Sequence, residues 1–175
     1  AAAVPGVPAR VVSAPVPRFL GSASPARLAT LQRAGVWPYV LVSQVDEDSV
    51  VTRAVLRYGG LAPQDVALLL ARDKCEAVTG LLADDDTCPR DAPVGALVLG
   101  CDSILEMDGQ AHGKPADEAE AISRWKRMRG TSAVLHTAHW LIDERDDSEG
   151  GTGATMGAVG PATGHFAQVR DDEIR

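Results

Sequence analysis

The stretch GALVLGC, residues 95–101, is a continuous apolar run that stops at a carboxylate, Asp102. A run without polar alternation is typical of a strand that is covered on both faces. We therefore expect an α/β fold with an interior strand over residues 95–101. A carboxylate at the end of a buried strand is either desolvated at a cost or bound to a positive group.

Residues 63–79 show helical periodicity and are expected to pack beside that strand. One arc of the helix is apolar, and Lys74 lies in the middle of it. A lysine in such a place can extend along the apolar surface and keep its ammonium in water. The alternative is that Lys74 points into an interior site. The apolar arc consists of Val66, Ala67, Leu70, Ala71, Ala77 and Val78.

A short apolar strand, a tight turn and a helix are expected over residues 19–35, FLGSASPARLATLQRAG. Ser24 suits the N-cap and Pro25 the first helical position, where its missing N–H costs nothing. Such a helix points unpaired N–H groups back at the turn, and this end attracts phosphates. Arg27 adds a forked donor that matches a phosphate. An ordinary capped helix is the other interpretation.

The remaining pattern predicts further elements around these. Strands are expected over residues 39–43, 133–143 and 164–169, a hairpin turn at Asp108-Gly109, and a helix over residues 117–129. Residues 144–164 are rich in glycine and acidic side chains, which predicts a flexible loop or linker. Residues 18–175 then form one domain, and residues 1–17 a flexible N-terminal tail.

The composition limits the classes of partner that this protein can bind. The net charge of -7 argues against a nucleic-acid backbone, and no apolar run approaches the length of a membrane span. A single nucleotide is compatible with this charge, because it needs only a few local cations. Cys75, Cys88 and Cys101 lack a metal-ligand spacing, and an odd number of cysteines does not suit a secreted disulfide framework. We therefore expect a cytoplasmic protein.

Several charged residues stand in contexts that are apolar, or are bracketed by glycine and proline. The cations among them suit a polyphosphate, and the carboxylates suit a divalent metal or a water molecule. Together they form the inventory of a nucleotide-cleaving site. They are the cations Arg27, Lys74 and Lys114 and the carboxylates Asp46, Glu47 and Asp102.

The order of the motifs is more specific than any one of them. The chain carries SASPARL, VDED, LLARDKCEAV, GCDSILEMDGQAHGKPAD, LHTAHWLID and HFAQVRDDEI in this order. From residue 19 to residue 174, the series resembles the Maf family of nucleoside triphosphate pyrophosphatases. The resemblance implies an α/β fold with a long, curved, mixed β-sheet, flanking helices and a two-lobed architecture like that of Maf and ITPase proteins. It also implies hydrolysis of a nucleoside triphosphate to the monophosphate and pyrophosphate, assisted by Mg²⁺ or Mn²⁺.

The resemblance also implies roles for single residues. Asp102 matches the family's catalytic proton acceptor, which deprotonates the attacking water or holds it on a metal ion. Glu47 matches the acidic residue of the second motif, and we expect it to share the metal with Asp102. The positions that match the family's phosphate-binding residues are Ser22, Arg27, Lys74 and Lys114.

Two positions depart from the known branches of the family, and both bear on base specificity. Where the pyrimidine-preferring branch has a second arginine after the proline, this chain has Ala26. Where that branch has threonine after the catalytic aspartate, this chain has Ser103. The branch that acts on methylated guanine nucleotides usually has Trp and Gln at these places. The base preference is therefore open.

The resemblance covers the first lobe and part of the second. The ending DDEIR looks like the opening of a helix, so we expect a C-terminally truncated domain with an incomplete second lobe and little turnover. A noncatalytic nucleotide-binding or interaction module, left by the truncation, is the competing hypothesis. A purely structural domain is a third hypothesis, but it requires that Lys74 and Asp102 both stand in apolar surroundings by chance. A homodimer is one option for the assembly.

Overall fold

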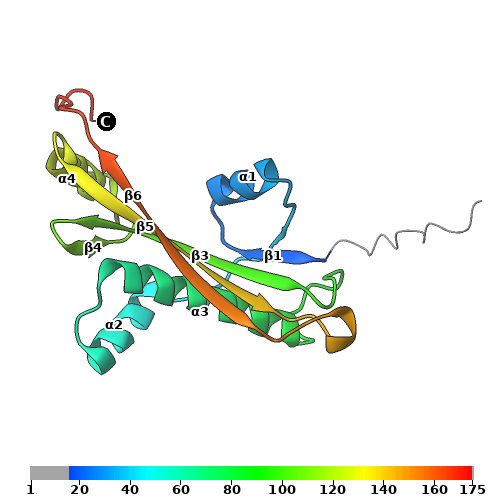
Figure 1. The fold of residues 1–175 in the computed structure, drawn as a ribbon. Helices are drawn as coiled ribbons and strands as arrows, with labels where there is room; N and C mark the ends of the chain where they lie inside the picture. The colour runs from blue at the N-terminus through cyan, green and yellow to red at the C-terminus, as the bar shows by residue number, and fades with distance from the viewer. Residues whose placement is uncertain (1–15, 175) are drawn as a thin grey trace, which may run out of the picture.

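The computed structural model describes residues 16–174, which form one mixed β-sheet with helices on both faces (Figure 1). The tail expected over residues 1–17 lies outside the described residues except for its last two. Within residues 16–174, no helix has both the length and the apolar character needed to cross a membrane. The strands are β1 (Arg18–Gly21), β2 (Tyr39–Val40), β3 (Leu97–Met107), β4 (Gln110–His112), β5 (Ser132–Asp143) and β6 (Thr155–His165). The helices are α1 (Pro25–Arg33), α2 (Glu47–Tyr58), α3 (Pro63–Ala83) and α4 (Glu118–Met128), with a 3₁₀ turn, η1 (Asp147–Glu149), before β6.

Parallel and antiparallel pairing meet at β3, so the sheet is mixed. β1 pairs in parallel with β2 and β3, whereas β5 pairs antiparallel with both β3 and β6. The order across the sheet is β2-β1-β3-β5-β6, and β4 folds back on β3. The long strands twist along their length (Figure 1). The expected α/β fold, with a mixed sheet and flanking helices, is confirmed.

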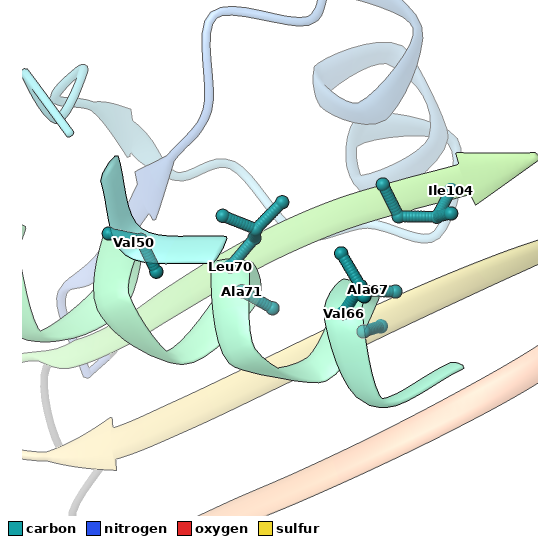
Figure 2. Close-up of a cluster of buried hydrophobic side chains, with 7 residues drawn as sticks. Val50, Val66, Ala67, Leu70, Ala71 and Ile104 are labelled. Carbon is teal, nitrogen blue, oxygen red and sulfur yellow. The ribbon is translucent and has the colours of Figure 1, made fainter. Parts of the chain in front are cut away.

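One face of the sheet is covered by α3, with α2 beside it (Figures 1 and 2). The helix expected over residues 63–79 is present and continues to Ala83. Its inner side chains pack on Ile104 of β3 and Ala138 of β5, and Val50 of α2 joins the same cluster. The buried residues of α3 are Pro63, Val66, Ala67, Leu70, Ala71, Lys74, Cys75 and Val78, so the predicted apolar arc faces the core.

The opposite face of the sheet is covered by helices near its two ends, by α1 at one end and by α4 at the other. Near β1, Leu31 of α1 lies close to Leu99 of β3. At the far end, Met128 of α4 packs on Met107 and Ala133. The expected cover on both faces of the apolar run is only partly confirmed, because Val98 is fully buried under α3, whereas Leu97 and Leu99, which face α1, are half-buried.

β3 is longer than the run that predicted it. Asp102 was expected to close the strand, which is wrong, because β3 continues to Met107. β1 pairs with β3 only as far as Gly21, which lies opposite Gly100. Beyond Gly100, β3 loses this neighbour and continues beside β5. Asp102 therefore lies in mid-strand but next to the end of β1, where the chain turns towards α1.

The loop expected over residues 144–164 is only partly a loop. Residues 155–165 form β6, which pairs with nearly all of β5, and the strand expected over residues 164–169 is wrong because β6 ends at His165. Gly157 lies opposite Trp140, and a Cβ there would come within 2.5 Å of the indole ring. This glycine therefore makes room for an aromatic ring and does not mark a turn.

Asp46 and Glu47, two of the carboxylates that the sequence singled out, lie at the start of a helix. Asp46 is the N-cap of α2, and its carboxylate accepts a hydrogen bond from the Ser49 N–H at 3.1 Å. Glu47 is the first residue of α2. An aspartate followed by acidic residues in the first turn is a helix-start signal, so the sequence contained the information. The strand expected over residues 39–43 is shorter, because β2 has only two residues.

Candidate active site

A cavity of about 490 Å³ opens where β1 and β2 end. Its wall comes from the β1–α1 turn, the segment between β2 and α2, α3, and the segment after β4. In an open α/β sheet, the carboxyl ends of parallel strands are the usual place for a ligand. The lining residues are Gly21, Ser22, Ala23, Ser24, Pro25, Arg27, Val42, Ser43, Glu47, Lys74 and Lys114.

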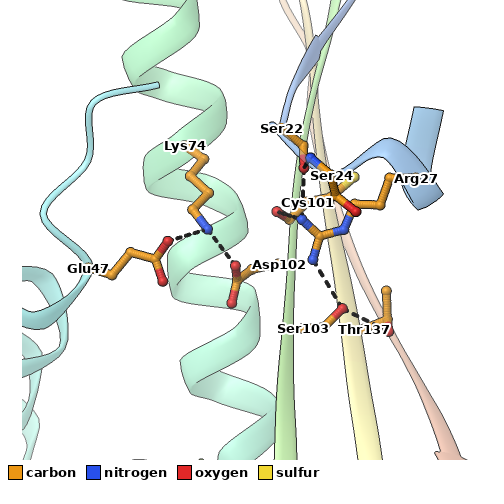
Figure 3. A network of polar contacts seen from close by, with 9 residues as sticks. All are labelled: Ser22, Ser24, Arg27, Glu47, Lys74, Cys101, Asp102, Ser103 and Thr137. Carbon is orange, nitrogen blue, oxygen red and sulfur yellow. Dashed lines mark hydrogen bonds and ion pairs between the residues drawn. The ribbon is translucent and has the colours of Figure 1, made fainter. Parts of the chain in front are cut away.

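Lys74 joins two carboxylates at this cavity (Figure 3). Its Nζ donates to Asp102 Oδ1 at 2.5 Å and pairs with Glu47 Oε1 at 2.7 Å. The side chains of Lys74 and Asp102 are only 11% and 9% exposed. The ammonium therefore does not extend into water, and Lys74 points into the interior site.

A glycine lets α3 approach β3 closely enough for this contact. A Cβ at Gly100 would overlap the carbonyl oxygen of Ala71 and lie 2.7 Å from the backbone nitrogen of Cys75. Gly100 and Asp102 are two residues apart on β3 and so face the same side. Because α3 lies directly against Gly100, Lys74 reaches Asp102.

Burial raises the pKa of the Asp102 carboxyl above its ordinary value. The hydrogen bond and the charge of Lys74 act in the opposite direction, and the negative charge of Glu47 adds to the effect of burial. A carboxylate whose pKa is raised is a stronger base than an exposed one. Asp102 therefore has the property that a proton acceptor needs.

Arg27 is held by three oxygen atoms on the other side of the β1–α1 turn (Figure 3). Its Nη1 donates to Ser22 Oγ at 2.8 Å and to the Cys101 carbonyl at 3.1 Å, and its Nη2 donates to Ser103 Oγ at 3.2 Å. β1 ends opposite Gly100, so the next carbonyl of β3 is free to accept from the guanidinium. These contacts fix the guanidinium at the cavity and leave part of its five-donor fork for a ligand.

α1 begins at the same cavity. Ser24 is its N-cap, as expected, but within residues 16–174 the Ser24 side chain forms no capping hydrogen bond. The Ser24 N–H donates instead to Ser22 Oγ at 3.3 Å, and Pro25 follows at the start of the helix. The N–H groups of the first turn have no partner within a helix, so they are available to an anion.

The structure brings the predicted site residues around one cavity. The three expected cations and Glu47 line it together with Ser22, and Asp102 joins them through Lys74. Of the two specificity positions, Ser103 contacts Arg27. Ala26 is exposed on α1 and is not part of the wall.

Two residues of this region were not predicted. Ser43 lines the cavity after β2, and no sequence pattern distinguishes it from other loop serines. Thr137 Oγ1 lies 3.1 Å from Ser103 Oγ (Figure 3). Thr137 could have been found, because an antiparallel pairing of the two long strands places it directly opposite Ser103.

Glu47 and Asp102 are the residues expected to hold a divalent metal. Their carboxylate oxygens converge on one positive charge, the Lys74 ammonium. Mg²⁺ is bound in proteins by one or two carboxylates together with substrate phosphates, and Mn²⁺ favours similar oxygen ligands. Among the described residues, no group of three or more His, Cys, Asp or Glu side chains could hold a metal. The two carboxylates therefore fit a metal that binds together with phosphates.

Comparison with known proteins shows the family to which this chain belongs. A family model described as Maf-like protein matches residues 17–175. The chain belongs to the Maf family. Curated relatives of this Maf chain include a nucleoside triphosphate pyrophosphatase of Salinispora tropica, 47% identical over 93% of this chain and 63% of the relative. Another, of Leifsonia xyli, has the same name and is 44% identical over 89% of this chain and 68% of the relative.

The Maf chain thus spans just under two thirds of the length of the Salinispora protein. Among solved structures, a nucleoside-triphosphatase / dITP/XTP pyrophosphatase of Mycobacterium abscessus matches with a TM-score of 0.41 and 18% identity. That match covers 88% of this chain and 76% of the other. A likeness this loose says nothing about the site.

Proposed function

We propose that this Maf protein hydrolyses a nucleoside triphosphate to the nucleoside monophosphate and pyrophosphate, with Mg²⁺ or Mn²⁺ as cofactor. The observation that carries the proposal is the Glu47–Lys74–Asp102 contact beside a cavity lined by Arg27 and Lys114. A buried carboxylate with a raised pKa lies next to a cluster of cations and hydroxyl groups, which are the side chains that suit a phosphate. The names of the curated relatives support the same reaction class.

The cavity wall accounts for binding of the triphosphate. Arg27 offers its free donors, Ser22 its hydroxyl, and α1 the N–H groups of its first turn. Lys114 is exposed and contributes a point charge from the segment after β4. Binding needs only these local cations, so the negative net charge of the protein does not oppose it.

Asp102 is the proposed proton acceptor. The water oxygen forms a bond to the α-phosphorus, the bond from that phosphorus to the oxygen bridging the β-phosphate breaks, and the water proton moves to a carboxylate oxygen of Asp102. A divalent ion held by Asp102, Glu47 and the phosphates would supply positive charge and a more acidic water. Lys74 keeps both carboxylates in place and has a third N–H donor for the phosphate contact expected of it. Arg27 and Lys114 neutralise the charge that grows on the departing pyrophosphate.

Several finer points stay predictions. Ala26 and Ser103 are our candidates for base preference, and pyrimidine, methylated guanine and other nucleotides are the alternatives. Cys75, Cys88 and Cys101 are free thiols in the described part of the chain, and a cytoplasmic setting remains an expectation from the sequence. A homodimer likewise stays one option for the assembly.

The deciding experiment measures the products from a panel of nucleoside triphosphates with Mg²⁺ or Mn²⁺, at a protein concentration high enough to detect the little turnover that the sequence predicts. We expect equal amounts of monophosphate and pyrophosphate, no turnover after chelation of the metal, and at least a ~100-fold loss in Asp102→Asn. Asp65→Asn, on the exposed side of α3, is the matched control and should keep full activity. Release of orthophosphate, or an active Asp102→Asn variant, would contradict the mechanism. Nucleotide-induced thermal stabilisation without turnover would favour the binding-module hypothesis.

A further inference from the structure

Lys114 reaches the cavity from a segment that belongs to no helix or strand. β4 ends at His112 and α4 begins at Glu118, so Lys114 lies in the connection between them. It is exposed, and it lines the cavity together with residues of the β1–α1 turn, α2 and α3. A charge on a free connection would spend little time at one position. Its backbone must be fixed if the ammonium is to meet a phosphate reproducibly.

Two side chains of α4 hold this connection on both sides of Lys114. Arg124 Nη1 donates to the Gly113 carbonyl at 2.5 Å, directly before the lysine. Glu120 Oε2 accepts from the Ala116 N–H at 2.7 Å, two residues after it. The two side chains also bind each other, with Arg124 Nη2 lying 2.6 Å from Glu120 Oε1. The lysine is thus enclosed between two charge-assisted hydrogen bonds from one ion pair.

The ion pair is itself well anchored. Glu120 and Arg124 are four residues apart and so lie on one face of the helix. The Arg124 side chain is only 11% exposed. The pKa of Glu120 is lowered, first by the Ala116 N–H and then by Arg124, so the carboxylate stays charged at neutral pH. Asp117, the N-cap of α4, accepts from the Glu120 N–H at 2.8 Å and fixes the start of the helix.

We infer that Glu120 and Arg124 are positioning residues that hold Lys114 at the triphosphate site. The inference rests on the proposed function, because Lys114 needs a phosphate to meet. Neither side chain lines the cavity, so both act through the backbone next to Lys114. Glu120 is 46% exposed and can be solvated when Arg124 is replaced, so removal of the pair should release the connection without unfolding the domain.

The test is a double-mutant cycle with Lys114→Ala. Arg124→Met should raise KM about tenfold and lower kcat as well, because a displaced lysine no longer meets the charge on the phosphates. Glu120→Gln should have a smaller effect, since the amide oxygen still accepts from Ala116. In the Lys114→Ala background, Arg124→Met should change kcat/KM less than twofold, because the group it positions is gone. Arg124→Lys should restore part of the loss.

Arg127→Met is the matched control. Arg127 lies on the same helix, is 51% exposed and pairs only weakly, at 3.4 Å, with Asp108. Its replacement should leave KM, kcat and Tm unchanged. The Tm of Arg124→Met should stay close to that of the unmutated protein, which separates positioning from unfolding.

The outcomes are distinguishable from those that test the proposed function. Loss of activity in Arg124→Met that persists in full in the Lys114→Ala background would overturn the positioning role, as would an unchanged Arg124→Met. If the protein releases no pyrophosphate, hydrolysis fails as the function, and the same cycle is measured on the Kd of an α,β-methylene triphosphate analogue. A non-additive cycle in that Kd would still support positioning, and an additive one would overturn it.

Discussion

Lys74 on α3 donates a hydrogen bond of 2.5 Å to Asp102 in the middle of β3, and this contact links the core of the protein to its site. Both side chains are buried, and Glu47 at the start of α2 completes the group at 2.7 Å from the same nitrogen. A buried ion pair of this kind contributes little net stability, but leaving one partner alone is costly. Replacing only one of the two residues should therefore destabilise the fold as well as disturb the proposed chemistry.

Replacing Lys74 by methionine should reduce the free energy of unfolding by roughly 3 kcal/mol, because Asp102 stays buried without a cation. Urea unfolding measures this. The double variant Lys74→Met/Asp102→Asn should be more stable than Lys74→Met alone, since no charge is then left unpaired at Asp102. Lys126→Met is the control, because Lys126 is 41% exposed and pairs with Asp171 at the surface. A Lys74→Met variant as stable as Lys126→Met would show that Asp102 is not desolvated.

A methyl group at Gly100 should separate α3 from β3. Gly100→Ala is expected to cost roughly 1–3 kcal/mol or more, because the added Cβ meets backbone atoms that cannot move aside easily. It should also reduce activity by withdrawing Lys74 from Asp102. Gly80→Ala is the matched comparison: Gly80 is in α3, and among the described residues nothing lies within 4 Å of its added Cβ. That variant should gain about 0.5–1 kcal/mol. Equal Tm changes in the two variants would contradict the close packing.

The periodic parts of the fold could be predicted from the sequence. Lys74 stands in an apolar arc with a period of 3.6 residues, and Asp102 directly follows a continuous apolar run, so both unusual charges were visible. The contact between them could not be derived from either pattern. It depends on how closely α3 approaches Gly100, which is a property of packing.

β6 was missed because its composition suggests the opposite of a strand. Glycine and proline usually mark turns, yet Gly157 lies opposite the Trp140 ring and Pro161 opposite His136. Pairing with a long neighbour outweighs local propensity here. The contacts of Glu120 and Arg124 with the segment around Lys114 could not be predicted from the sequence either. They depend on how α4 is placed relative to the connection before it.

The loop between β5 and β6 should respond to acid through Asp143. Its carboxylate accepts from Arg145 Nε and Nη2, both at 2.8 Å, and from the Thr152 N–H and hydroxyl. The hydrogen bonds from Arg145, first of all, lower the pKa of Asp143. A lowered pKa contributes stability above the unfolded-state value of about 3.9, and this is lost as pH falls towards the folded-state value.

Asp143→Asn should therefore be less stable than the unmutated protein at pH 7 and pH 5, and the difference should shrink below about pH 4. Urea unfolding at several pH values measures it. Asp91→Asn, an exposed aspartate in another loop, is the control and should leave the pH dependence unchanged. A stability difference between Asp143→Asn and the unmutated protein that is constant from pH 7 to pH 3 would mean that the charge of Asp143 is not responsible.

Arg27→Lys should be costly although it keeps the charge. The guanidinium donates to Ser22, to the Cys101 carbonyl and to Ser103, which lie in three directions around it. An ammonium on a flexible stem cannot reach all three and also face a phosphate. Losing one or two such hydrogen bonds corresponds to a roughly ten- to hundredfold fall in kcat/KM. Arg33→Lys, in the exposed last turn of α1, should have no effect on kcat/KM. If Arg27→Lys keeps its kcat/KM within twofold, charge alone is enough, and the geometry of the fork has no part in binding the triphosphate.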